Sequence, residues 1–267
     1  MNILILGSSG VIGKNLTKFL KNKGYNVIEF DIKMGEIYDL RKVESINLLK
    51  MKIQEADYVF FLAFDVGGSK YLENINVLKY IDNNMSIMKN VFECINNKPF
   101  IFASTQMENM YCSYGALKRV GEMYTKSLNG VSVRFWNVYD KEDYDEKSHV
   151  ITDFIYKAKN YGFIELMTNG EESRQFLHAD DCSEGLFTIM NNHNELKNRD
   201  IALHLTNHIW SSILEVAEII GKIYNCKILI NKNKVDTLQT LHNEPDTFLS
   251  KYWSPSISLE DGIKSLL

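Results

Sequence analysis

The chain has 267 residues, a formal net charge of −4, and 45% hydrophobic and 24% charged residues. This composition is typical of a soluble globular protein with a substantial core, in one large domain or two small ones. The net charge gives no reason to expect a nucleic acid or an anionic membrane as a partner. The longest apolar runs are strand-sized, so no segment is expected to span a bilayer.

The cysteines and the N-terminal sequence indicate a cellular compartment. Cys94, Cys112, Cys182 and Cys226 are scattered without the spacing of a metal site, so we expect free thiols and no bound metal. The apolar residues 3–6 follow the start directly, without a basic segment or a cleavage site. We therefore predict a cytoplasmic protein.

The first elements predict a phosphate-binding turn. Residues 3–6 form a short apolar run, residues 7–13 are rich in glycine, and a helical pattern then continues to Gly24. Glycines let the backbone approach a pyrophosphate, and a helix N-terminus favours its negative charge. An ordinary tight turn is the alternative. The expected cofactor-binding residues of this turn are Gly7, Ser9, Gly10, Val11, Ile12 and Gly13.

Two acidic residues follow the next predicted strands. The strand at 26–30 ends in Asp31, 18 residues beyond the last glycine of the turn, where a carboxylate binds the adenosine ribose. A carboxylate there repels a 2′-phosphate, which favours NAD over NADP. Asp39 closes a short third strand predicted at 37–38. It either contacts the adenine edge or caps a helix before Arg41.

The middle of the chain predicts a central parallel strand and a long helix. Residues 58–63 are apolar throughout, as expected for a strand buried on both faces. The helix predicted at about 76–96 carries Asn84 near its middle. Asn84 either points into the site as a substrate ligand or is an ordinary exposed helix residue.

The segment from Thr105 to Lys118 predicts the chemistry. Thr105 ends a buried strand at 100–104, while Tyr114 and Lys118 are four residues apart and so share one helix face. A lysine ammonium beside a phenol lowers the tyrosine pKa towards working pH. Tyr114 would then exchange a proton with a sugar hydroxyl or a carbonyl. Alone, this spacing is also typical of a solvated helix face.

The second half continues the pattern with shorter elements. A strand at 131–135 leads to Asn137, and Arg174 either binds phosphate or pairs with a neighbouring glutamate. The remaining predicted elements are a helix at 148–160, a strand near 164–166, a strand at 201–205, a helix at 211–224, a strand at 228–230 and a closing helix within 257–267.

Together these motifs carry a family resemblance. They are Gly7-x-x-Gly10-x-x-Gly13, Asp31, Leu62-Ala63, Ser104-Thr105, Tyr114-x-x-x-Lys118, Arg134 to Tyr139 and Arg174 to Asp181. The chain resembles an extended short-chain dehydrogenase/reductase of the NAD-dependent epimerase/dehydratase family, which acts on nucleotide sugars. The resemblance covers essentially the whole chain.

The resemblance implies an α/β fold with a Rossmann-type doubly wound parallel sheet and a smaller C-terminal region. Residues 1–140 would bind NAD, with strands and a helix returning from about 175–210, and residues 141–267 would bind substrate. Leu62 and Ala63 would border the cofactor. A homodimer through helix 76–96 and the helix of Tyr114 is also expected.

The resemblance also implies roles in the reaction. Tyr114 would take the sugar proton, Lys118 would hold the cofactor ribose, and Thr105 would hydrogen-bond the reacting oxygen. Asn137 and Arg174 would contact the diphosphate of a nucleotide-diphosphate sugar.

Two departures narrow the choice within the family. Gln106-Met107 replaces the acidic pair of 4,6-dehydratases, and Met107 also replaces the catalytic cysteine of GDP-mannose 3,5-epimerase. Only eight residues separate Thr105 from Tyr114, fewer than is usual in the family. We therefore expect a 4-epimerase.

Several alternatives stay open. They are a 4-dehydrogenase or 4-ketoreductase, a dehydratase of the same family, and an enzyme of hydride transfer on non-sugar substrates. A non-catalytic NAD-sensing scaffold on the same fold is the alternative from another class, although such relatives usually lose the tyrosine or the lysine, and this chain retains both.

Overall fold

The computed structural model describes residues 1–109, 112–233 and 243–267. Its centre is a parallel six-stranded sheet in the order β2-β1-β3-β4-β5-β9. The strands are β1 (Asn2–Leu6), β2 (Asn26–Phe30), β3 (Tyr58–Phe61), β4 (Phe100–Thr105), β5 (Gly130–Phe135) and β9 (Leu203–Leu205). Because β1 pairs with both β2 and β3, the winding reverses there, and ligands bind at the carboxyl ends of strands at such a point. The predicted doubly wound α/β fold is confirmed.

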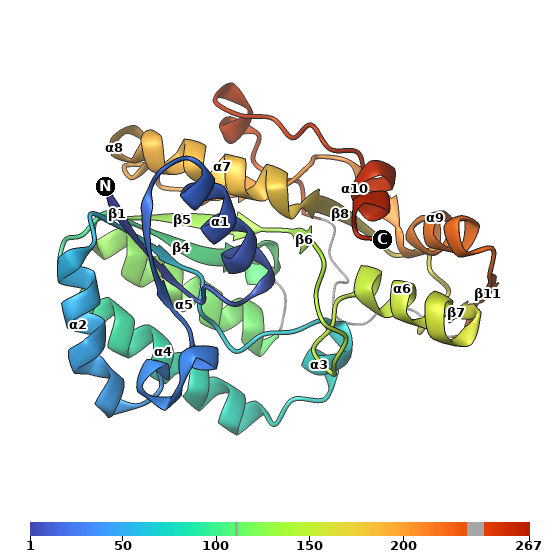
Figure 1. Ribbon diagram of the computed structural model, residues 1–267, viewed down its shortest axis with the longest axis horizontal. Helices are drawn as coiled ribbons and strands as arrows, with labels where there is room; N and C mark the ends of the chain where they lie inside the picture. Colours follow the sequence, from blue (N-terminus) through green and yellow to red (C-terminus); the bar gives the residue numbers. More distant parts are fainter. Residues whose placement is uncertain (110–111, 234–242) are drawn as a thin grey trace.

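Helices cover both faces of this sheet (Figure 1). One face carries α1 (Val11–Asn22), α7 (Ala179–Asn191) and α8 (His193–Leu196), and the other carries α2 (Ile46–Glu55), α4 (Val77–Ile95) and α5 (Ser113–Ser127). An apolar core lies on each face of the sheet, and successive residues of a strand point into opposite cores. Ile3 and Ile5 belong to one apolar cluster, whereas Leu4 and Leu6 belong to the other. This alternation explains the continuously apolar run in the sequence.

Two glycines bring α5 close to β4. A Cβ atom on Gly121 would lie 2.2 Å from the ring of Phe102, and one on Gly115 would lie 2.0 Å from the carbonyl oxygen of Met107. Gly121 therefore lets α5 pack closely on β4. Gly115 lets the first turn of α5 pack closely on the short helix η4 (Gln106–Asn109). These contacts determine where the first turn of α5 lies relative to the end of β4.

The predicted third strand at 37–38 is wrong. This segment contains the short 3-10 helices η1 (Ile32–Met34), η2 (Glu36–Tyr38) and η3 (Val43–Ser45). Gly35 has a φ of +132°, which redirects the chain between the first two. The ring of Tyr38 packs 5.0 Å from that of Phe30, whereas Ile37 is 48% exposed, so the two residues do not form the buried strand that was predicted.

The smaller region lies beyond the carboxyl ends of β4 and β5 (Figure 1). It contains a three-stranded sheet in the order β10-β8-β6 and a two-stranded sheet of β11 and β7. Its elements are β6 (Asn137–Tyr139), α6 (Val150–Tyr161), β7 (Phe163–Glu165), β8 (Ser173–His178), β10 (Trp210–Ser212), α9 (Ile213–Tyr224), β11 (Lys227–Leu229) and α10 (Leu259–Ser265). The chain crosses back to the large sheet through α7 and β9. None of the described helices combines the length and the hydropathy needed to cross a bilayer.

Candidate active site

The glycine turn follows β1 and packs against the end of β3. Gly7 has a φ of +89°, and a Cβ atom on it would lie 2.7 Å from the amide nitrogen of Ala63. A Cβ atom on Gly13 would lie only 2.1 Å from the carbonyl oxygen of Gly7. The amide of Leu62 donates to the carbonyl of Leu6, 2.9 Å away. The protein's own backbone therefore requires Gly7 and Gly13, and the turn lies beside Leu62 and Ala63 as expected.

Gly10 differs from these two glycines. A Cβ atom there would meet only the carbonyl oxygen of Gly7, at an ordinary contact distance of 3.5 Å. Gly10 precedes α1, and the N–H groups of the first turn, including those of Val11 and Ile12, have no acceptor within the helix. Open space beside unpaired N–H groups at the positive end of a helix fits the pyrophosphate of a dinucleotide.

Asp31 lies at the carboxyl end of β2 and contacts the turn. Its Oδ2 accepts a hydrogen bond of 3.0 Å from the amide of Ser9, and its Oδ1 accepts one of 2.9 Å from the amide of Lys33. The carboxylate is thereby fixed beside the turn, at the position predicted for ribose binding. The ribose contact itself stays a prediction.

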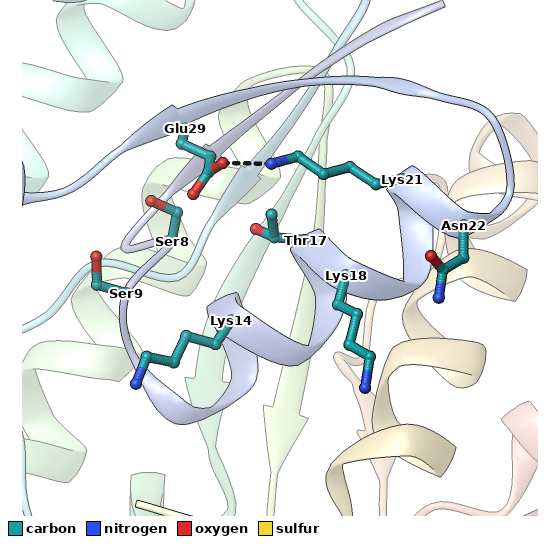
Figure 2. Close-up of a pocket in the computed structure, with 8 residues that line it drawn as sticks. All are labelled: Ser8, Ser9, Lys14, Thr17, Lys18, Lys21, Asn22 and Glu29. Atoms are coloured by element: carbon teal, nitrogen blue, oxygen red, sulfur yellow. Dashed lines mark hydrogen bonds and ion pairs between the residues drawn. The ribbon is translucent and has the colours of Figure 1, made fainter. Parts of the chain in front are cut away.

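A pocket of about 420 Å³ borders the same turn between α1 and β2 (Figure 2). The hydroxyls of Ser8 and Thr17 are buried at its wall without a hydrogen-bond partner among the described residues. Its other lining residues are Ser9, Lys14, Lys18, Lys21, Asn22 and Glu29, and Lys21 pairs with Glu29 at 2.6 Å. The lysines of α1 place positive charge beside the phosphate cradle.

Asp39 is buried and paired with Arg41. The guanidinium donates from Nε to Oδ1 and from Nη2 to Oδ2, both at 2.8 Å. This hydrogen bonding holds the pKa of Asp39 below its usual value. No helix begins between them, so the predicted helix cap is wrong, although Oδ1 does accept the amide of Arg41 at 3.1 Å. Contact with adenine stays a prediction.

Thr105 and Tyr114 meet at the carboxyl end of β4. The threonine hydroxyl lies close enough to the phenol to favour its ionised form, and it accepts a hydrogen bond of 3.2 Å from the amide of Met107. Burial raises the pKa of Tyr114 to about 12, and the neighbouring Thr105 hydroxyl opposes this rise. The predicted pair of reacting groups is therefore assembled, with the phenol in its protonated form.

Lys118 lies one turn further along α5 and is 3% exposed. Its Nζ donates a hydrogen bond of 2.6 Å to the carbonyl of Ala103 and lies 3.7 Å from the centre of the Phe64 ring. The centre of the Tyr114 ring is 5.9 Å away. Burial lowers the pKa of Lys118 to about 7, and the charge of Glu122 opposes this change.

These pKa values correct one sequence-based expectation. We predicted that Lys118 would lower the pKa of Tyr114, but the structure shows the phenol pKa raised. Lys118 is buried and Tyr114 is partly buried, and removal from water disfavours the charged form of each. The spacing in the sequence identified the pair but carried no information on burial.

Asn84 is fully buried and holds the loop that follows β3. Its Oδ1 accepts the amide of Asp65 at 2.7 Å, and its Nδ2 donates to the carbonyls of Asp65 and Tyr80 at 3.2 and 3.1 Å. The alternative of an exposed helix residue is therefore wrong. In this structure the carboxamide positions the backbone of Asp65, and a contact with substrate stays a prediction.

The sequence analysis assigned no role to Asp65, which joins two loops. Its Oδ1 accepts from the ammonium of Lys147 at 2.7 Å and from the hydroxyl of Tyr71 at 2.9 Å, and its Oδ2 accepts from Asn83 at 3.1 Å. Burial raises the pKa of Asp65, but these bonds outweigh it and the net shift is downward. The amide of Gly68 also donates to the carbonyl of Lys147 at 2.9 Å. The sequence signal that could have identified Asp65 is an acidic residue in the loop that follows a central strand.

Asn137 and Arg174 lie on the small three-stranded sheet. Asn137 follows Phe135, the register partner of Thr105, so it lies at the same edge as the predicted reacting groups. Its Nδ2 donates to the carbonyl of Gln175 at 3.5 Å. Arg174 is 8% exposed and donates from Nη1 to the carbonyl of Ser173 at 2.8 Å. Their contact with a diphosphate stays a prediction.

Comparison with known proteins identifies the family. The model of the NAD dependent epimerase/dehydratase family matches residues 3–203. The chain belongs to this family. The matched residues include the glycine turn, Thr105, Tyr114 and Lys118. Membership of this family indicates that the protein is an enzyme rather than a non-catalytic scaffold.

Individual relatives in this family are distant but nearly full-length. The chain is 26% identical to GDP-L-colitose synthase of Yersinia pseudotuberculosis, over 98% of this chain and 96% of the relative. It is 26% identical to GDP-mannose 3,5-epimerase 1 of Oryza sativa subsp. indica, over 99% and 80%. The structure of GDP-mannoheptose C4 reductase from Campylobacter jejuni with NADP bound superposes with a TM-score of 0.80 at 21% identity, over 99% and 96%. This superposition confirms the fold.

Proposed function

We propose that this enzyme moves a hydride at C4 of a nucleotide-diphosphate sugar with NAD, and that it does so as a 4-epimerase. The observation that carries the proposal is the position of Thr105 beside Tyr114 at the end of β4, where the hydroxyl favours the ionised phenol. In this position the Thr105 hydroxyl and the Tyr114 phenol can both hydrogen-bond one substrate oxygen. Oxidation of an alcohol and reduction of a ketone both need such groups at the reacting oxygen.

Each residue has a defined part in this proposal. Bound at the glycine turn, NAD would supply the acceptor and donor of the hydride that leaves the sugar carbon and returns to it. Thr105 hydrogen-bonds the reacting oxygen, and Tyr114 exchanges its proton. Because burial holds the phenol protonated, Tyr114 is ready to donate to a keto oxygen. Its action as a base requires loss of that proton, which the neighbouring hydroxyl of Thr105 favours.

Met107 argues against two other reactions of the family. Its side chain is 4% exposed, follows the Thr105 turn and has no ionisable group. Epimerisation at C3 and C5 and elimination of water both need a proton transfer at a sugar carbon. A hydride taken and returned at C4 needs only Thr105, Tyr114 and Lys118, so we favour 4-epimerisation.

We infer a GDP-sugar as the substrate, because both curated relatives described above are named for GDP-sugar reactions. In this proposal Asn137 and Arg174 contact the diphosphate. Arg174 suits that part, because a guanidinium binds phosphate oxygens in a bidentate manner. The loop of Asp65, held by Asn84 and Lys147, forms the neighbouring wall.

We propose NAD rather than NADP as the cofactor and a homodimer as the assembly. The carboxylate of Asp31 lies beside the turn, where it disfavours a 2′-phosphate. For the dimer, α4 and α5 expose Met85, Met123 and Tyr124 by 37%, 70% and 45%. Exposed apolar side chains on neighbouring helices suit burial against a second copy.

The test is to incubate purified enzyme with NAD and a panel of GDP- and UDP-hexoses and to analyse the products. A 4-epimerase yields the C4 epimer without net NADH, and Tyr114→Phe abolishes this product. Accumulation of NADH and a ketosugar would instead establish a 4-dehydrogenase. NAD binding without any reaction on the panel would contradict the proposed substrate class.

A further inference from the structure

A second group of charged residues lies directly behind the reacting residues. Glu122 follows Lys118 by four residues on α5, and its side chain is 15% exposed. Its Oε1 accepts from Nε of Arg134 and its Oε2 from Nη2, both at 2.8 Å. Its Oε1 also accepts from the hydroxyl of Ser104 at 2.6 Å. This bidentate pair is more shielded from water than a surface ion pair.

The pair joins three elements of the site. Ser104 on β4 and Arg134 on β5 are register partners, and Glu122 reaches both of them from α5. Ser104 immediately precedes Thr105 in the strand. The pair is therefore bonded to the segment that carries the reacting hydroxyl and to the helix that carries the reacting phenol.

Few groups face the ammonium of Lys118. From β4 it meets the carbonyl of Ala103 and the ring of Phe102, 5.1 Å from its centre, and from the loop after β3 it meets Phe64. The groups from its own helix are Tyr114 and Glu122. Among the described residues, Glu122 is the carboxylate whose charge opposes the loss of the lysine proton.

We propose that the Glu122–Arg134 pair is a positioning device that sets how tightly Lys118 holds its proton inside the protein. Its effect on catalysis rests on the proposed function, in which Lys118 supports Tyr114. Glu122 and Arg134 do not touch the reacting groups. They act on Lys118 through their charges: the negative charge of Glu122 favours the protonated lysine, and the positive charge of Arg134 disfavours it.

This balance predicts effects of opposite sign. Glu122→Gln keeps the size of the side chain and its acceptor for Ser104 but leaves the positive charge of Arg134, so Lys118 loses its proton more easily. Arg134→Gln leaves the negative charge of Glu122, so Lys118 keeps its proton to higher pH. Shifts of about 0.5 to 1 pH unit are expected for one charge at this spacing.

The pKa of Lys118 can be measured without cofactor or sugar. The free energy of unfolding by urea is measured between about pH 6 and pH 10, and the same series is measured for Lys118→Met. The difference between the two curves begins to rise at the folded pKa of Lys118, near 7, and continues to rise to the upper end of this range, because the unfolded value is 10.5. The starting point of this rise is the readout.

The measurement is repeated in the Glu122→Gln and Arg134→Gln backgrounds. The proposal predicts that the rise starts at lower pH in the first and at higher pH in the second. Arg134→Lys, which keeps the charge, should restore the native value. Glu55→Gln, which breaks the exposed Lys52–Glu55 pair of 3.0 Å, is the matched control and should shift nothing.

The outcomes decide the proposal directly. Loss of stability without any shift, or shifts of the same sign in both variants, would show that the pair is only structural and would overturn it. If Arg134→Gln fails to fold, Glu122→Gln is compared with Glu122→Asp, which keeps the charge. The proposal then predicts a rise at lower pH in Glu122→Gln and no shift in Glu122→Asp. In the active enzyme, the pH dependence of turnover should move in the same directions. Absence of sugar turnover would contradict the proposed function and leave the unfolding result valid.

Discussion

The ammonium of Lys118 donates a hydrogen bond of 2.6 Å to the main-chain carbonyl of Ala103, two residues before Thr105 in β4. The same ammonium lies 3.7 Å from the centre of the Phe64 ring. A carbonyl oxygen and a π-face both favour a cation, but neither replaces bulk water. Lys118 is therefore a buried base whose charge depends on its immediate surroundings.

This burial predicts how stability changes with pH. The pKa of Lys118 is about 7 in the folded chain and 10.5 in the unfolded chain. Between these values the unfolded chain binds the proton and the folded chain does not, so stability rises with pH across this window. Lys118→Met removes the buried charge, and should be more stable than the native chain by a few kcal/mol below pH 7. The advantage should shrink towards pH 10. Urea unfolding measures it, and a constant difference across this range would contradict the depressed pKa.

Two glycines of the turn should respond differently to alanine. Gly13→Ala places a Cβ atom 2.1 Å from a backbone oxygen, so it should destabilise the fold by about 1–3 kcal/mol or more. Gly10→Ala meets nothing closer than 3.5 Å, so it should fold normally and lose affinity for NAD. Thermal unfolding and calorimetric titration separate the two effects. Unchanged NAD affinity in Gly10→Ala would argue against the phosphate cradle.

Asp31 should control the choice of cofactor. Asp31→Asn removes the negative charge beside the turn while keeping an acceptor for the amide of Ser9. Repulsion between like charges costs several kcal/mol, so the ratio of NADP to NAD affinity should rise about tenfold or more. Titration of both cofactors into native and variant protein measures this ratio. A native preference for NADP would refute the argument from charge.

The Asp65–Lys147 bond should hold the wall of the substrate site. Lys147→Met removes the ion pair of 2.7 Å but keeps the apolar stem, so the loop after β3 should loosen. We expect a higher KM for the sugar nucleotide and unchanged affinity for NAD. Lys264→Met, which breaks an exposed pair with Glu260 at 2.8 Å, is the control. Equal effects of both variants on KM would exclude a local role for Asp65.

The sequence predicted the fold because it follows local rules, and the same rules identified the candidate reacting residues, whose roles stay a prediction. The continuously apolar strands, the glycine turn and the spacing of Tyr114 and Lys118 can each be recognised within a few residues. The strand predicted at 37–38 is wrong because a 3-10 turn packs only Tyr38, against Phe30, and leaves Ile37 exposed. Such short segments are decided by their tertiary neighbours.

Contacts distant in sequence were beyond prediction. Asn84 binds the backbone of Asp65, and Asp65 binds Lys147, 82 residues away. The position of Glu122 four residues after Lys118 was readable, but its pairing with Arg134 depends on the register of β4 and β5. The raised pKa of Tyr114 depends on burial that no spacing reveals.

The most direct test of the central claim is the reduction of bound NAD by a sugar nucleotide. Native enzyme loaded with NAD is mixed rapidly with a GDP-hexose, and the absorbance of reduced nicotinamide is followed. We predict a transient rise in the native enzyme and a loss of about 10²–10⁴-fold in its rate in Tyr114→Phe, with NAD affinity unchanged. The same rise in Tyr114→Phe as in the native enzyme would contradict the part assigned to the Thr105–Tyr114 pair.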